Sequence, residues 1–193
     1  MNEAANDVWT YSWGASRFKS AVVYRRLLGH QHINPAFKWL YKSPCQPKHK
    51  VFFWLLLKDR LSTRNILRRK HMALETYNCE ICLMLVEETV DHLFWHCPFA
   101  QWCWGLLGLK VVQAGEAFEN VLAIKDQMHS QFFMVAVILM SWTIWKARNE
   151  LIFNNNQLGI QECKNYFFNE VNLVSLRVKA SLSAHFDQWI QQL

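Results

Sequence analysis

The chain has 193 residues, of which 52% are hydrophobic and 15% aromatic, with a formal net charge of +6. This length fits one domain with at most a small addition, and the apolar content excludes a disordered tail. Residues 1–7 lack the apolar core of a secretory leader, so we expect an intracellular protein, in the nucleus or cytoplasm, with a mitochondrial location left open. In a reducing compartment the six cysteines favour metal ligation over disulfides.

The first third of the chain predicts short elements. Alternating aromatic residues between positions 9 and 13 predict a short N-terminal strand or hairpin. Apolar residues then recur with helical spacing from Ser20 to Gly29, where glycine ends the helix. A short helix follows around residues 37–41.

Two further helices are predicted before the cysteine-rich stretch. Pro47 opens a buried helix that includes the apolar run 51–57 and continues to Leu61. Ser62 and Thr63 can cap a short, very basic helix over residues 64–70.

Residues 79–97 contain a metal-binding pattern. Cys79 and Cys82 are separated by two residues, His92 follows after nine more, and Cys97 after four more. Three thiolates and one imidazole complete the tetrahedral shell that structural Zn²⁺ prefers, so we expect one structural zinc ion. His96 could replace Cys97, because His92 and His96 are four residues apart. A closed shell has no place for a reactive water, and no local catalytic signature is visible, so we expect no enzymatic activity.

The second half of the chain predicts long helices. After a mixed segment, 110–130, residues 131–153 form an apolar helix. Its apolar run, from Phe132 to Trp145, is shorter than the roughly twenty apolar residues needed to span a bilayer, so we expect a buried helix and no membrane. Apolar residues in 160–193 recur in steps of three and four, which predicts one long amphipathic helix. Its apolar face either packs on 131–153 or binds a protein partner or a second copy. Strand signals are nearly absent beyond residue 20, so the predicted fold class is mostly α.

Positive charge is concentrated in one segment. Residues 38–71 contain ten Lys or Arg and one acid, a net charge of +9, so the rest of the chain carries −3. Arg60, Arg64 and Arg68 share one helical stripe if the turn near Ser62 keeps the helical phase. The segment is either a solvated face or a surface that contacts the phosphates of RNA or DNA. The residues predicted for phosphate contacts are Lys48, Lys50, Arg60, Arg64, Arg68, Arg69 and Lys70.

Four stretches resemble a known family. They are Trp13-Gly14 with Arg17–Ala21; residues 39–63, with Pro47-Lys48 and Asp59–Thr63; Cys79–Cys82 with Glu88–Ala100; and Trp142–Asn149. This pattern is similar to the zinc-binding domain that follows the reverse transcriptase in plant LINE-type (non-LTR) retroelements, and the segment after it.

The resemblance implies a retroelement-derived chain, as a fragment or a domesticated stand-alone descendant. It implies Cys97, rather than His96, as the fourth zinc ligand. It also implies a zinc-binding domain over residues 1–109 and a helical C-terminal extension, 110–193, packed on it. The Tyr-x-Asp-Asp motif of a reverse transcriptase does not occur in the chain.

Overall fold

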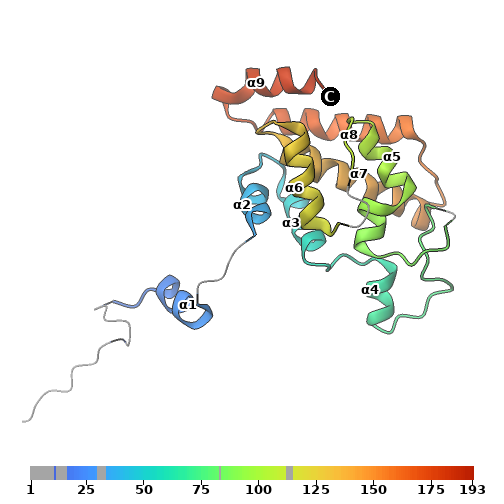
Figure 1. Cartoon of the computed structure of the whole chain (residues 1–193), viewed down its shortest axis with the longest axis horizontal. Helices are drawn as coiled ribbons and strands as arrows, with labels where there is room; N and C mark the ends of the chain where they lie inside the picture. The colour runs from blue at the N-terminus through green and yellow to red at the C-terminus, as the bar shows by residue number, and fades with distance from the viewer. Residues whose placement is uncertain (1–10, 12–16, 30–33, 83, 112–114) are drawn as a thin grey trace, which may run out of the picture. The chain divides into compact units, whose positions relative to one another are not determined.

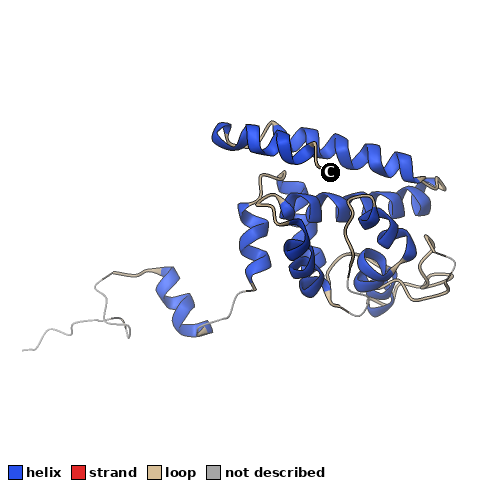
Figure 2. Ribbon diagram, turned by 45° about the horizontal axis from the view of Figure 1, so that its top comes forward, coloured by secondary structure: helices blue, strands red, loops and turns tan. Residues whose placement is uncertain are grey.

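The computed structural model describes residues 11, 17–29, 34–82, 84–111 and 115–193. These residues divide into two compact units, Met1–Asn34 and Pro35–Leu193. Helices dominate both units, and the described residues form no sheet, only an isolated antiparallel bridge between Asn78 and Glu87. Figures 1 and 2 show this helical architecture. The mostly α fold class is confirmed.

The first unit contains helix α1, Ser20–Leu28, which ends at Gly29 as predicted. Gly29 has a φ of +66°, which glycine adopts without the steric cost that a side chain would bring. The strand predicted around residues 9–13 lies, except for Tyr11, outside the described residues.

The second unit begins with three helices that follow the sequence signals closely: α2 (Pro35–Lys42), α3 (Pro47–Leu57) and α4 (Arg64–Arg69). Prolines occupy the first positions of α2 and α3, where the missing N–H is not needed. The predicted extension of α3 to Leu61 is wrong, because α3 ends at Leu57 and Asp59 has a φ of +49°. This turn changes the helical phase between Arg60 and α4.

Helix α7, Phe133–Asn154, lies at the centre of the second unit. It contacts α2 and α3, the helical turn η1 (His92–His96), α5 (Pro98–Gly105), α6 (Ala117–Met128) and α8 (Ile160–Ser175). Its residues 133–141 are all buried, which explains why the sequence is apolar on every side of the helix. No helix within the described residues combines the length and the apolar character that crossing a membrane requires.

The single long helix predicted for 160–193 is wrong. The chain forms α8 and α9 (Ala180–Ile190), joined by a turn at residues 176–179 that contains neither glycine nor proline. The turn lets Phe186 and Trp189 pack against Phe132, with ring centroids 4.9 and 5.6 Å away. Burial of these aromatic rings outweighs the helical preference of the connecting residues.

Packing also decides where the apolar face of 160–193 lies. Its main apolar residues are buried within the second unit: Cys163, Phe167, Val171, Val174, Phe186 and Trp189. Of the two predicted alternatives for this apolar face, packing within the unit against α7 is therefore the one that the structure shows. The predicted boundary at residue 109 stays a prediction.

Candidate metal centre

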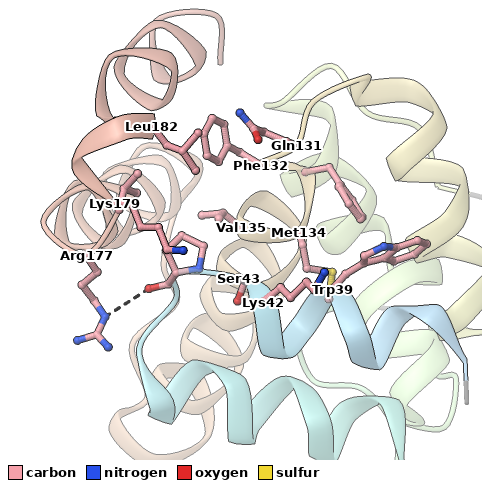
Figure 3. A pocket seen from close by; sticks show the side chains of 13 residues that line it. Trp39, Lys42, Ser43, Gln131, Phe132, Met134, Val135, Arg177, Lys179 and Leu182 are labelled. Atoms are coloured by element: carbon pink, nitrogen blue, oxygen red, sulfur yellow. Dashed lines mark hydrogen bonds between the residues drawn. The ribbon is translucent and has the colours of Figure 1, made fainter.

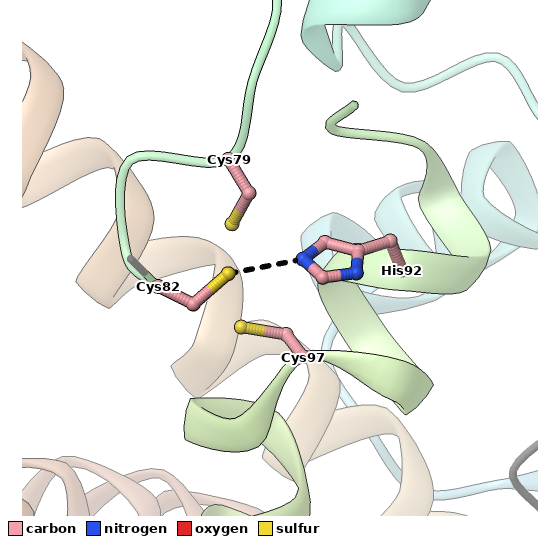
Figure 4. A group of neighbouring side chains, drawn as sticks. All are labelled: Cys79, Cys82, His92 and Cys97. Atoms are coloured by element: carbon pink, nitrogen blue, oxygen red, sulfur yellow. Dashed lines mark hydrogen bonds between the residues drawn. The ribbon is translucent and has the colours of Figure 1, made fainter. Parts of the chain in front are cut away.

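Four side chains converge beside the N-terminus of α5. The Sγ atoms of Cys79, Cys82 and Cys97 and a ring nitrogen of His92 all lie within 4.8 Å of one another. Figure 4 shows the three thiols and the imidazole pointing toward a common centre, with Cys82 Sγ 3.3 Å from His92 Nε2. In a tetrahedral zinc shell with bonds of about 2.0–2.3 Å, neighbouring ligand atoms lie roughly 3.4–3.8 Å apart. The cluster therefore could hold zinc after small side-chain adjustments.

A short loop presents the first two cysteines. The N–H of Cys79 donates to Val86 O at 2.8 Å, and the N–H of Glu88 donates to Tyr77 O at 2.9 Å. These bonds flank the Asn78–Glu87 bridge and close the loop at its base. Backbone N–H groups within the loop also face the sulfur atoms, from Cys82 toward Cys79 and from Met84 toward Cys82. The loop therefore supports both thiolates as well as positioning them.

A wide helical turn presents the other two ligands. Thr89 Oγ1 accepts a hydrogen bond from the N–H of His92 at 3.0 Å, which is the bond of a helix N-cap. The N–H of Cys97 then donates to His92 O, five residues back, at 2.6 Å, which is the bond of a π-helical turn. In an α-helix, positions five apart differ by about 140° around the axis. The wider turn brings His92 and Cys97 to the same side.

The structure brings Cys97, and not His96, to the other three ligands. Cys97 directly precedes Pro98, the first residue of α5. The exposed fraction of Cys97 is 0%. From the residue spacing alone, either Cys97 or His96 could be the fourth ligand, because no periodic sequence pattern predicts a π-helical turn.

The thiols influence one another's acidity. A hydrogen bond with Cys97, together with burial, raises the pKa of Cys79 to about 12. The same bond lowers the pKa of Cys97, and the N–H groups of Phe99 and Ala100 at the start of α5 lower it further. Burial raises the pKa of Cys82. Without a metal ion, Cys97 is thus the thiol best prepared to ionise, and a bound cation would draw the others to the thiolate form.

A buried ion pair anchors the cysteine loop to the central helix. Glu88 is 0% exposed and follows the loop directly. Its carboxylate accepts two hydrogen bonds from Arg148 of α7, from Nη2 at 2.8 Å and from Nε at 3.3 Å. This pair could not be predicted from the sequence, because 60 residues separate the partners and no local pattern connects them.

Glu88 also caps α4. Its Oε1 accepts the N–H of Arg64 at 3.0 Å, and its main-chain oxygen accepts the N–H of Asn65 at 3.1 Å. Thr63 occupies the predicted cap position, but its side chain makes no capping bond. One buried carboxylate therefore joins the cysteine loop, the basic helix and the central helix.

The residues predicted to contact phosphate differ in their environments. Arg64 is only 8% exposed, pairs with Glu80, and donates to Thr76 O at 2.6 Å, so it belongs to the interior. Lys48 pairs with Glu170 at 3.4 Å, and Lys50 donates to Tyr41 O at 3.0 Å. These three residues are engaged within the unit, and the stripe expected from Arg60, Arg64 and Arg68 does not form.

The remaining four predicted residues are exposed on and beside α4: Arg60, Arg68, Arg69 and Lys70. Arg68 pairs with Glu87 and Arg69 with Asp59, each at 2.9 Å. Arg60 and Lys70 have no ion-pair partner within the described part of the chain. We call this group the α4 cation surface.

A buried Cys₃His cluster, closed by a loop and a helical turn, defines a candidate zinc-binding domain. Residues 18–104 match a family model described as zinc-binding in reverse transcriptase, and this range contains all four cluster residues. The match covers a little under half of the chain and supports a zinc-binding domain of the reverse-transcriptase type. No curated protein and no solved structure matches the chain significantly.

Proposed function

We propose that this chain is a non-enzymatic, zinc-stabilised module that binds RNA or DNA and derives from a LINE-type retroelement of plants. One zinc ion, held by Cys79, Cys82, His92 and Cys97, has a structural role. Four protein ligands leave no coordination position for a reactive water. The proposed origin rests on the sequence stretches described above and on the family match over residues 18–104. We expect the protein in the nucleus or the cytoplasm.

The observation that carries the nucleic-acid part is the α4 cation surface beside the cysteine loop. Arg60 and Lys70 are exposed without an acidic partner among the described residues, and Arg68 and Arg69 have side chains that are 58% and 60% exposed. Exposed ion pairs contribute only about 0–1 kcal/mol, so a phosphate can replace Glu87 or Asp59 at little cost. Arg64 is left out of the proposed interface because it is buried.

Binding to a labelled single-stranded RNA and to the duplex DNA of the same sequence tests this proposal. Fluorescence anisotropy at about 50 and 200 mM salt gives both affinity and salt dependence. Replacing Arg60, Arg68 and Lys70 by Glu should lower affinity more than tenfold and reduce the salt slope for RNA by about 2, since each phosphate contact contributes roughly 0.7.

A matched variant separates local contacts from overall charge. Lys110, Lys125 and Lys164 are also exposed and do not belong to this surface, and their replacement by Glu changes the net charge by the same amount. We expect this variant to bind within about threefold of the wild type, because charges outside the contact surface are largely screened at 0.15 M salt. Equal losses in the two variants would show non-specific attraction and contradict the proposed surface.

A protein partner bound through residues 160–193 is the second candidate, with zinc purely structural. The apolar face of α8 is buried, so we expect such a partner to use Leu173 and Leu176, the two most exposed large apolar residues described in this segment, at 46% and 82%. Replacing both by Ser should then abolish self-association or co-purification of a partner while leaving RNA binding unchanged. An unchanged elution volume and interaction profile would remove this candidate.

A further inference from the structure

A pocket of about 620 Å³ opens in the second unit, away from the metal centre. Figure 3 shows its walls, which come from α2, the start of α7 and the α8–α9 connection. The walls are mainly apolar, with Trp39 on one side and Phe132 and Leu182 on another. Ligand pockets in proteins usually measure about 300–1,000 Å³ and have predominantly apolar walls. The pocket thus has the size and lining of a small-molecule site.

The charges at this pocket all have the same sign. Lys42, Arg177 and Lys179 are exposed members of its lining, and no Asp or Glu belongs to the lining. None of the three forms an ion pair within the described part of the chain; Arg177 donates one hydrogen bond, to Pro44 O at 3.3 Å. Three cations without acidic partners, around an apolar cavity, favour a ligand that is anionic at one end and apolar at the other.

The polar groups inside the pocket narrow the ligand class further. Ser43 is the buried polar residue of the lining, and its hydroxyl already donates to Leu40 O at 2.8 Å. Gln131 is exposed. A nucleobase inserted here would bury its ring nitrogens and exocyclic groups without partners, which is costly. A hydrocarbon chain has no such groups and gains free energy from each buried methylene.

We propose that this pocket binds a fatty acid with an acyl chain of medium length, such as dodecanoate. The acyl chain lies against Trp39, Phe132, Met134 and Val135, and the carboxylate is bound by Lys42, Arg177 and Lys179. This site is separate from the α4 cation surface, and the inference does not depend on nucleic-acid binding.

Isothermal titration calorimetry of the full chain with dodecanoate, kept below its critical micelle concentration, tests the proposal. We expect one dodecanoate per chain, and affinity for dodecanol, which has the same chain without the charge, about tenfold lower. Replacing Lys42, Arg177 and Lys179 together by Gln should lower dodecanoate affinity to that of dodecanol and leave dodecanol binding unchanged. Leu182→Trp, which fills the pocket, should weaken both ligands.

The control variant replaces Arg25, Lys110 and Lys164 by Gln, which removes two lysines and one arginine from outside the pocket lining. It should bind dodecanoate like the wild type. No saturable binding to the wild type, equal affinity for dodecanol and dodecanoate, or equal losses in the two triple variants would overturn the proposal. Single-stranded RNA that displaces dodecanoate from the wild type, and whose own binding is abolished by Leu182→Trp, would instead assign the pocket to nucleic acid. If the pocket triple variant does not fold, as judged by circular dichroism, Lys179→Gln and Leu182→Trp decide the result.

Discussion

The interior around the metal centre and the surface of α4 both contain polar and charged groups, but these groups act differently. In the interior, the groups that join the elements face specific partners: the four cluster residues converge, and Glu88 binds Arg148 and the N-terminus of α4. On the surface, Arg68 and Arg69 pair with single carboxylates while remaining more than half exposed. Interior groups should therefore determine whether the chain folds, and surface groups what it binds.

The largest expected effect follows loss of a metal ligand. Cys82→Ser should abolish stoichiometric zinc binding and unfold the second unit, since binding energies in small zinc domains are on the order of 10–16 kcal/mol. Zinc content by mass spectrometry and helicity by circular dichroism measure the two effects together. Excess chelator should have the same effect on the wild type.

Cys45→Ser provides the control, because Cys45 is also buried but lies outside the cluster. It should keep its zinc and lose at most about 1–3 kcal/mol of stability. A Cys82→Ser protein that stays folded without metal and loses only its RNA binding would contradict the structural role of zinc.

The next largest effect should come from the buried ion pair. Arg148→Met leaves the Glu88 carboxylate charged at 0% exposure, and breaking such a pair costs about 3–5 kcal/mol. Urea unfolding at saturating zinc measures this cost. Adding Glu88→Gln should recover part of the loss, because the uncompensated charge is then gone.

Lys146→Met is the comparison for Arg148→Met on the same helix. Lys146 has a side chain that is 41% exposed and pairs with Glu150 at 3.5 Å. Its replacement should cost less than about 1 kcal/mol. If Lys146→Met and Arg148→Met were equally destabilising, the distinction between interior and surface charges would fail.

His49 supplies a pH-dependent test of the same interior. Burial lowers the pKa of His49 from 6.5 to about 4, against the opposing effect of Glu170, whose Oε2 lies 3.4 Å from His49 Nε2. Between these two pH values the unfolded chain binds more protons than the native one, so stability falls as the pH drops from about 6.5 to 4. The loss approaches roughly 3 kcal/mol at its limit, at 1.36 kcal/mol per pKa unit.

If the four cluster residues bind zinc as proposed, their protonation should also destabilise the protein in acid, so the contribution of His49 must be measured separately. The free energy of unfolding of the wild type and of His49→Gln should be measured across the same pH range. Zinc loss affects both proteins equally, and the difference between their curves reports His49. A difference that does not change between pH 7 and pH 4 would exclude a depressed native pKa.

Much of this architecture could be predicted from sequence because its signals are local. Pro47, Gly29 and the apolar spacing placed helix ends within a few residues, and the cysteine spacing predicted the four side chains that converge. Residues 160–193 contain a turn that local sequence signals do not predict. Their spacing is helical throughout, yet the chain turns at 176–179 because Phe186 and Trp189 pack on the distant Phe132.

The prediction that Arg60, Arg64 and Arg68 form one exposed stripe was wrong for a related reason. A count of charges cannot distinguish Arg64, buried against Thr76 and Glu80, from Arg68, which is exposed four residues later. The partners of Arg64 belong to the cysteine loop and to the segment just before it, so the burial of Arg64 depends on how that loop closes. The same holds for Glu88 and Arg148, whose pairing depends on a contact between residues that are 60 positions apart.

Arg64 and Arg68 allow the most direct comparison of an interior with a surface cation, because both are arginines of the same helix. The expected effects are also the smallest. Arg64→Gln removes the donor to Thr76 O and the partner of Glu80, which should cost about 1–3 kcal/mol. Arg68→Gln removes an exposed pair with Glu87 and should cost less than about 1 kcal/mol. RNA affinity should show the reverse order, with Arg68→Gln weakening binding and Arg64→Gln leaving it unchanged in the folded protein. If Arg64→Gln weakened RNA binding more than Arg68→Gln, the exposed side of α4 would not be where nucleic acid binds. If Arg68→Gln were the more destabilising substitution, the interior would not depend on Arg64.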